Sequence, residues 1–358
     1  MDEHELVSAL KALALELGKI PTRREFTTRH RGADYSLTRT FGTYIALVKA
    51  AGMETHNGKL DRTIESPFNA KSPQALLREY KALCSRREQI QGFFRTVLDL
   101  KDLFERAGNP PVLKLLAQGD THAKFVDRAA FNAYKKFASY YCPDIHLIMG
   151  DFVDCEGLSH WPPDDLEPRR IVPEMKIGRA LLQETVESTP TCSTRLFLEG
   201  NHERWIEQAF TKMPELFDGL AELDIEINVK TLLGLSSFGY EFFPLNELLQ
   251  IGGAHFTHGL YTGKHHAAKH LDTFKTNIYY GHLHDTQEHN QTGIDGHVEA
   301  SCLGCLCRKD AKFLKGKPNN WVHTAPVFEF FPDGSYNHYK PRIFNGRMAF
   351  NGMVFDGN

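Results

Sequence analysis

The stretch DIHLIMGDFVD, residues 144–154, joins a short apolar run to a glycine and two aspartates. A run of four to eight apolar residues that ends at a turn residue is typical of a buried strand. Gly150 lets the backbone turn tightly, so that Asp151 can point from the strand end into a cleft. Similar runs, VLKLLAQ before residue 119 and TRLFLEG before residue 201, alternate with amphipathic helical segments from residue 110 onward. This alternation predicts an α/β fold.

The later part of the chain predicts a second sheet. It contains the apolar runs LLQIGGAHFTHG and NIYYGHLH, and the hairpin-like segment PVFEFFPDGSYNHYKPRIF. Asp333 and Gly334 within that segment form a strong turn signal. We therefore expect residues 110–358 to form a two-layered mixed β-sheet sandwich flanked by helices.

Five short segments place a metal-binding type of side chain directly behind such a run. They are GDTH (119–122), GDFVD (150–154), GNHE (200–203), THG (257–259) and GHLH (281–284). Open α/β sheets build their sites at the carboxyl ends of strands. Carboxylates, one amide oxygen and several imidazoles form a mixed set of hard and borderline ligands, which suits Mn, Fe, Zn or Mg ions rather than copper or calcium alone.

In this order, the five segments resemble the sequence blocks of the calcineurin-like metallophosphoesterases over residues 119–284. The resemblance implies the metallophosphoesterase fold for residues 110–358 and hydrolysis of a phosphoester by a hydroxide that bridges two divalent ions. Manganese is the expected metal, and iron, zinc, magnesium and nickel are the alternatives. Carried over block by block, the resemblance implies that Asp120, His122 and His284 hold one ion, that Asn201, His258 and His282 hold the other, and that Asp151 bridges both.

The same resemblance suggests catalytic and supporting residues. His202 stands where the family keeps a cleft histidine, which makes it the candidate general acid beside Asp151. Glu203 could fix the tautomer of this histidine or position the loop, and Asp154 is expected to orient its loop rather than to bind metal. Arg204 is either a replacement substrate-binding cation or part of an ordinary surface salt bridge.

Two positions depart from the family pattern. Ala123 follows the first histidine, where the family often has glycine, and this change is mild. Cys155 and Glu156 stand where the protein phosphatases have Arg-Gly, so a phosphate-binding arginine is lost. That loss argues against a protein phosphatase.

Residues 1–53 predict a separate all-α unit of the helix-turn-helix type. Leucines recur at helical spacing up to Leu17, Thr22 and Glu25 form a capping-box pattern, and a third helix is expected over about residues 36–48. Residues 16–53 resemble the repeat attached to homing endonucleases, which implies DNA as a partner. Seven basic and two acidic side chains lie within residues 17–50, and the candidate DNA contacts are Arg23, Arg24, Arg29, Arg31 and Arg39. A solvated helical face or a protein-docking unit is the alternative.

The segment between these two parts predicts a linker and a helix. Residues 54–72 are polar and rich in turn residues, whereas residues 73–109 have an apolar face at helical spacing and predict one or more long connecting helices. Such a face would pack on the catalytic domain or on a partner chain, which would allow oligomerisation through residues 73–107.

Composition narrows the class of protein. The net charge of −3 excludes a global basic field, and the absence of a signal-peptide pattern or a long apolar span makes a cytoplasmic protein without a membrane segment the expectation. The odd number of cysteines, seven, argues against a disulfide framework. Cys302, Cys305 and Cys307 could hold a metal, but without a second cysteine pair we expect buried thiols.

Three functions remain open from the sequence. The first is a metal-dependent phosphodiesterase, a nuclease acting on DNA. The second is a phosphatase or nucleotide phosphodiesterase whose helical module docks to a protein. The third is a non-catalytic DNA-binding scaffold, against which the intact residues of every block argue.

Overall fold

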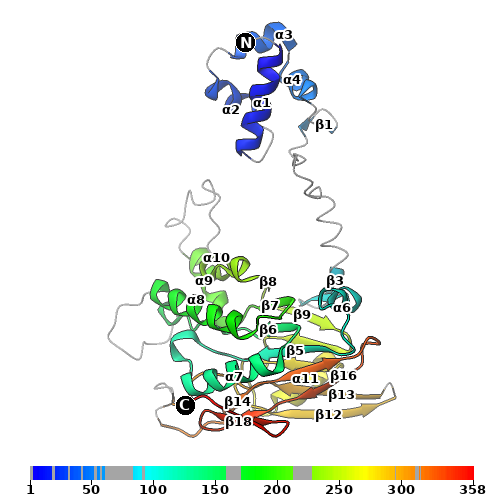
Figure 1. Ribbon diagram of the computed structural model, residues 1–358, viewed down its shortest axis with the longest axis vertical. Coiled ribbons are helices and arrows are strands. Elements are labelled where there is room, and N and C mark those ends of the chain that lie inside the picture. The colour runs from blue at the N-terminus through cyan, green and yellow to red at the C-terminus, as the bar shows by residue number, and fades with distance from the viewer. Residues whose placement is uncertain are drawn as a thin grey trace. The chain divides into compact units, whose positions relative to one another are not determined.

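The computed structural model describes residues 3–17, 21–30, 33–41, 43–51, 55–56, 59–60, 84–90, 93–158, 171–212, 228–294, 296–310, 314 and 316–358. The chain divides into two compact units, Met1–Ala82 and Leu83–Asn358 (Figure 1). None of the helices in the described part of the chain combines the length and the apolar character that crossing a membrane requires.

The N-terminal unit is helical, as predicted. It contains α1 (Glu3–Leu17), α2 (Arg23–Arg29), α3 (Ala33–Phe41) and α4 (Tyr44–Ala50). Leucines of α1, Phe26 of α2 and apolar residues of α3 and α4 share one buried core. The capping box is confirmed, because the Thr22 hydroxyl accepts from the Glu25 backbone N–H at 3.3 Å and the Glu25 carboxylate accepts from the Thr22 N–H.

Two expectations about this unit need correction. The predicted third helix is two helices, because the Thr43 hydroxyl accepts the Ala46 backbone N–H at 3.2 Å and starts α4 anew. Within the predicted linker, β1 (Thr55–His56) and β2 (Lys59–Leu60) form an antiparallel pair, whereas residues 61–72 lie outside the described part.

The larger unit contains a six-stranded sheet. Its order is β16 (Tyr336–Tyr339), β15 (Val327–Phe330), β5 (Leu113–Gln118), β6 (Ile145–Ile148), β7 (Thr194–Leu198) and β8 (Tyr240–Phe243). Strands β5 to β8 run parallel, and β15 pairs antiparallel with β5 and β16. The turn predicted at Asp333 and Gly334 joins β15 to β16, and Gly334 has a φ of 87° that favours glycine.

A second, seven-stranded sheet is also mixed. Its order is β12 (Glu288–Gly293), β13 (Gly296–Cys302), β11 (Ile278–Tyr280), β10 (Ala254–Thr257), β9 (Glu247–Ile251), β4 (Phe93–Leu98) and β3 (Cys84–Ile90). Strands β10, β11 and β13 run parallel, as do β4 and β9. Short pairs are formed by β14 (His323–Thr324) with β17 (Arg342–Ile343) and by β18 (Arg347–Phe350) with β19 (Met353–Asp356).

Alternation along the strands explains how the layers pack. Leu115 and Leu147 belong to the apolar core shared by the two sheets, whereas their neighbours Leu116 and Ile148 belong to the core under the helices. Complete burial of each such side chain contributes roughly 1.5–3 kcal/mol. The helices are α7 (Arg128–Tyr141), α8 (Ile171–Ser188), α9 (Asn201–Lys212) and α10 (Val229–Leu233) beside the six-stranded sheet, and α11 (His266–Phe274) on the seven-stranded one. The single-turn helices η1 (Ala123–Phe125), η2 (Glu156–Leu158) and η5 (Leu235–Phe238) lie in connections.

The prediction of long helices over residues 73–109 is wrong for its described part. Residues 84–98 form the β3–β4 hairpin, and only α6 (Leu100–Arg106) is helical. The β-branched Thr96 and Val97 favour a strand, and β4 gains a parallel partner in β9 that local periodicity does not reveal. The larger unit therefore begins near residue 83 rather than 110, and within the described residues no long helix is present over 73–107 to carry the expected oligomerisation surface.

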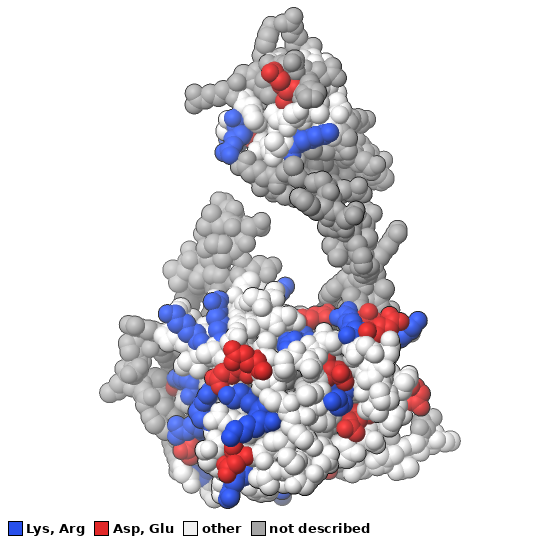
Figure 2. All heavy atoms as spheres, viewed as in Figure 1, with Lys and Arg blue, Asp and Glu red and all other residues white. Residues whose placement is uncertain are grey.

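Charge on the larger unit is mixed in sign. Figure 2 shows basic and acidic side chains interspersed on the face in view, consistent with the small net charge of the chain. Glu184, for example, pairs with both Arg128 and Lys135. A mixed surface of this kind provides no single-sign field for attracting a polyanion.

Candidate metal centre

The polar residues of the five segments follow the carboxyl ends of strands, as predicted. Asp120 follows β5, Asp151 follows β6, and Asn201 begins α9 after β7. From the second sheet, His258 follows β10, and His282 and His284 follow β11. The two packed sheets therefore present these residues from different strands at one end.

Four residues of these segments other than glycine have a left-handed backbone conformation. Their φ angles are 49° at His122, 45° at Asp151, 69° at His282 and 63° at His284. Such conformations in residues other than glycine cost on the order of 1–3 kcal/mol each and gather at functional sites. The fold therefore tolerates an energetic cost at these four residues, whose side chains point towards the candidate metal centre.

Asp120, His122 and His284 converge at a first point. The Nε2 atoms of His122 and His284 are 3.1 Å apart, and Nε2 of His284 is 3.0 Å from Oδ2 of Asp120. His122 Nδ1 lies 2.8 Å from the Asp154 carboxylate, so a neutral His122 ring that donates from Nδ1 has a lone pair at Nε2. Both Asp120 carboxylate oxygens are buried and have no hydrogen-bond partner among the described residues.

A second point of convergence lies around Asp151. Nε2 of His258 is 3.1 Å from Oδ2 of Asp151 and 3.0 Å from Oδ1 of Asn201. The Nδ1–H of His258 donates to the Met149 carbonyl at 2.9 Å, so the Nε2 atom would present a lone pair inward whenever the ring is neutral. Nδ1 of His282 lies 3.9 Å from Oδ2 of Asp151 and is buried without a hydrogen-bond partner among the described residues.

At both points the lone pairs of imidazole nitrogens and of carboxylate or amide oxygens face one another, and a positive charge between them would stabilise this arrangement. Burial alone would lower the pKa of His258, but the Asp151 carboxylate raises it to about 10. Burial opposes the ionised form of Asp151, yet His258 and His202 hold the pKa of Asp151 well below its ordinary value. Divalent ions would supply this charge, and the two carboxylates, one amide oxygen and four imidazoles fit them. The structure thus brings all seven predicted ligands together.

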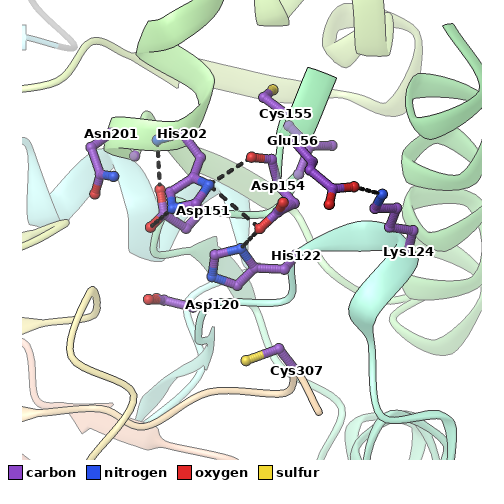
Figure 3. A network of polar contacts seen from close by, with 12 residues as sticks. Asp120, His122, Lys124, Asp151, Asp154, Cys155, Glu156, Asn201, His202 and Cys307 are labelled. Carbon is purple, nitrogen blue, oxygen red and sulfur yellow. Dashed lines mark hydrogen bonds and ion pairs between the residues drawn. The ribbon is translucent and has the colours of Figure 1, made fainter. Parts of the chain in front are cut away.

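The structure adds Cys307 to this neighbourhood. Three groups of residues each have ligand atoms within 4.8 Å of one another. The groups are His122 with His284 and Cys307, His122 with Asp151 and His202, and Asp151 with His258 and His282. The Cys307 sulfur is buried, 3.7 Å from Nδ1 of His284, and lies on the side of Asp120 in Figure 3. Cys302 and Cys305 are free buried thiols, as predicted.

Glu203 holds the loops that carry the ligands. Its carboxylate accepts the backbone N–H groups of Gly200, Asp151, Phe152 and Val153 at 2.7–3.0 Å. Burial and the neighbouring Asp151 charge raise the pKa of Glu203 to about 8. A positioning role was predicted for this residue, and four backbone bonds provide it.

Asp154 lies at the centre of a second supporting network (Figure 3). Its carboxylate accepts from His122, and its backbone carbonyl lies 2.6 Å from Nδ1 of His202. Glu174 of α8 is almost fully buried and accepts the N–H groups of Asp154 and Cys155 at 2.5 and 2.8 Å. The sequence analysis did not identify Glu174, because no local motif surrounds it and its partners Asp154 and Cys155 lie 20 and 19 residues earlier in the sequence.

Arg204 forms the salt bridge that was the simpler of its two interpretations. Its guanidinium pairs with Glu207 on the same helix and lies 3.9 Å from Glu199. In Figure 3, the ion pair of Lys124 and Glu156 lies near the network around Asp154.

The candidate DNA contacts belong to the N-terminal unit. Arg23, Arg24 and Arg29 are exposed on α2, and Arg39 lies within α3. Arg31 lies outside the described residues.

Comparison with known proteins relates the N-terminal part to a family. Residues 1–54 match the sequence model of the homing endonuclease associated repeat. No curated protein matches the chain. Among solved structures, a single mutant of Vps29 from Entamoeba histolytica has 12% identity and a TM-score of 0.29, covering 65% of this chain and all of its own. Vps29 from Chaetomium thermophilum has 11% identity and a TM-score of 0.30, covering 69% of this chain and all of its own. At such TM-scores the likeness carries no conclusion.

Proposed function

We propose that this protein is a metal-dependent phosphodiesterase of the calcineurin-like metallophosphoesterase type that cleaves DNA. The observation that carries the proposal is the convergence of seven side chains at two adjacent points. At one point the Asp120 carboxylate is buried without a hydrogen-bond partner among the described residues, and at the other Nδ1 of His282 is buried in the same state. The two points are close, because His122 and Asp151 also fall within one group of nearby ligand atoms.

Asp120, His122 and His284 would hold one ion, Asn201, His258 and His282 the other, and Asp151 would bridge them. When bound, the two ions would activate a water molecule and offset the charge of the phosphoryl oxygens. We expect manganese, with iron, zinc, magnesium or nickel as alternatives, because the ligand set is mixed in hardness.

His202 is the group that would protonate the leaving oxygen. Its Nδ1–H can donate to the Asp154 carbonyl at 2.6 Å, which leaves Nε2 on the side of Asp151, 3.8 Å from Oδ2. The His202 side chain is 21% exposed, whereas that of the neighbouring ligand His122 is 7% exposed, so a substrate can reach His202. Proton transfer by such a group contributes about 100- to 10,000-fold to the rate.

The first experiment compares two substrates with different leaving groups. The p-nitrophenolate released from bis(p-nitrophenyl) phosphate needs little protonation, whereas the alkoxide released from an oligonucleotide needs it. With manganese present, His202→Ala should lower kcat for the oligonucleotide about 100- to 10,000-fold and change bis(p-nitrophenyl) phosphate much less. Asp151→Asn should abolish both reactions, and Glu207→Gln, on the same helix as His202, should change neither.

The outcomes separate the alternative functions. Equal losses on both substrates in His202→Ala would exclude its role as the proton donor. Turnover of phosphomonoesters or mononucleotides without cleavage of DNA would indicate a phosphatase or nucleotide phosphodiesterase. No turnover in the wild type with any of the five metals would indicate a non-catalytic scaffold.

DNA as the substrate rests on the N-terminal unit. The match to the homing endonuclease associated repeat supports it, as do the exposed Arg23, Arg24 and Arg29 of α2. Basic side chains on one small module bind phosphates even when the whole chain is slightly acidic.

Charge reversal in the full-length chain tests this second step. Arg23→Glu combined with Arg24→Glu should weaken DNA binding, reduce its salt dependence, and leave hydrolysis of bis(p-nitrophenyl) phosphate unchanged. Lys11→Glu is a matched control, because Lys11 is also exposed on this unit but lies on α1. Unchanged DNA affinity in the double variant would favour a protein-docking role for the unit.

A further inference from the structure

Cys307 brings a sulfur atom to the point where Asp120, His122 and His284 converge. Its ligand atom lies within 4.8 Å of ligand atoms of both His122 and His284. The sulfur is 3.7 Å from Nδ1 of His284, and the residue is only 2% exposed. Figure 3 shows Cys307 in the neighbourhood of Asp120 and His122. The sulfur therefore belongs to the first ion-binding point by position, although none of the five segments contains it.

The backbone holds Cys307 beside the loop that begins at Asp120. The Leu306 N–H donates to the Asp120 carbonyl at 2.8 Å, and the Asp127 N–H donates to the Leu306 carbonyl at 2.9 Å. Cys307 itself forms a β-bridge with Val126. These bonds fix the sulfur relative to the first point before any ion binds. A ligand group that is fixed in advance loses little conformational entropy on binding.

Asp120 shows independently that this point lacks a positive charge. The residue is fully buried, and neither oxygen of its carboxylate has a hydrogen-bond partner among the described residues. A buried carboxylate is unfavourable unless a cation or a donor faces it. A metal ion that binds Asp120 would therefore sit where the buried sulfur of Cys307 is also close by.

The spacing of these groups suits a zinc ion. Zinc in proteins is held by cysteine sulfur at about 2.3 Å, histidine nitrogen at about 2.0–2.1 Å and carboxylate oxygen at about 2.0–2.2 Å. Two ligand atoms of one zinc ion are therefore at most about 4.4 Å apart. The observed limit of 4.8 Å for His122, His284 and Cys307 requires only a small adjustment to reach this value.

The two ion-binding points differ in this respect. The group at the second point, Asp151 with His258 and His282, contains no cysteine. Thiolate sulfur favours zinc, whereas carboxylate and amide oxygens suit manganese. A sulfur ligand at the first point alone would make the two points prefer different metals.

We propose that Cys307 is a sulfur ligand of the first ion and makes this point selective for zinc over manganese, while manganese remains the metal of the second point. The inference deepens the proposed function and rests on its two ion-binding points. When zinc binds, the thiol releases its proton to solvent and the sulfur forms a bond to the ion. In the rival interpretation, the sulfur only accepts the Nδ1–H of His284 and orients that ring from outside the ion's ligand shell.

Cobalt(II) is the probe that separates these two interpretations, because it occupies zinc sites and its bond to a thiolate gives a charge-transfer absorption band in the near ultraviolet. The metal-free full-length protein should develop this band when cobalt chloride is added. Cys307→Ser should lose the band. Cys305→Ser is the matched control and should keep the band, because Cys305 is equally buried on the same segment but belongs to none of the ligand groups of the described residues. Wild-type protein that binds cobalt without the band would overturn the proposal.

Metal selectivity provides a second measurement. In competition with a chromophoric chelator, Cys307→Ser should weaken zinc binding at the first point by at least about 10- to 100-fold and change manganese binding much less. Equal losses for the two metals would contradict the selectivity. X-ray absorption at the zinc edge needs no variant, so it decides the question even if Cys307→Ser fails to fold. Zinc-loaded wild type should show a sulfur neighbour at about 2.3 Å, and a shell of nitrogen and oxygen alone would overturn the proposal.

These measurements do not depend on catalysis, so the two proposals can fail separately. A protein that shows the sulfur ligand but hydrolyses no phosphodiester would overturn the catalytic proposal alone. Hydrolysis of bis(p-nitrophenyl) phosphate by a cobalt-loaded protein without the charge-transfer band would overturn the role of Cys307 alone.

Discussion

Substitution of Gly281 by alanine should disrupt the first ion-binding point through a single methyl group. A Cβ at this position would lie 2.4 Å from Oδ1 of Asp120, and real Cβ atoms essentially never approach within 3.0 Å, so the carboxylate must move by at least 0.6 Å. Ligand positions in metal sites are fixed to within about 0.2 Å. Asp120 is fully buried, so it has little room to adjust.

We expect Gly281→Ala to weaken binding at this point by at least about 10- to 100-fold, the loss typical when a residue that positions a metal ligand is changed, which corresponds to roughly 1.4–2.7 kcal/mol. Titration calorimetry with manganese and metal analysis after dialysis would measure the change. Gly263→Ala is the control, because a Cβ there would meet nothing within 4 Å and no unusual φ restricts it. Metal affinity in Gly281→Ala equal to that of wild type and of the control would refute the placement of Asp120 as a ligand.

Two further predictions concern stability. Glu174→Gln should be nearly neutral, because one oxygen of Glu174 accepts both backbone N–H groups. Glu174→Leu leaves one buried and one partly buried donor unpaired and should lower the free energy of unfolding by about 2–6 kcal/mol, measured by urea unfolding followed by tryptophan fluorescence. Equal stability of the two variants would contradict this assignment. Burial lowers the pKa of His146 from 6.5 to about 3. The unfolded chain therefore binds a proton at this residue more readily than the folded chain does. The free energy of unfolding of the wild type should fall as the pH drops from 6.5 towards 3, by up to about 1.4 kcal/mol per pH unit. His146→Gln should flatten this slope, and an unchanged slope would count against a neutral buried imidazole.

Local chemistry allowed much of the fold and site to be predicted. The capping box at Thr22 and the turn at Gly334 depend on neighbours within a few residues, and both are present. The residues behind β5, β6, β7, β10 and β11 were predicted to meet because strand ends share an edge of a sheet, and their side chains do converge.

Long-range contacts set the limit of prediction. The apolar residues of 84–98 fit a helical period, but β4 within this stretch pairs with β9, some 150 residues later, and β3 pairs with β4 in the same sheet. Glu174 belongs to no motif, and Cys307 belongs to a cysteine cluster that was expected to be buried thiols rather than metal ligands. The neighbours of both residues are determined only by the folded chain. Tertiary pairing of this kind overrides local propensity.

A crystal of the protein soaked in manganese, measured near the manganese absorption edge, tests the central claim most directly. We expect two anomalous peaks about 3.5–4 Å apart on either side of Asp151, one beside Asp120 and the other beside Asn201. A map without manganese peaks at these side chains, or with peaks only elsewhere on the chain, would contradict the dinuclear centre and the activity proposed from it.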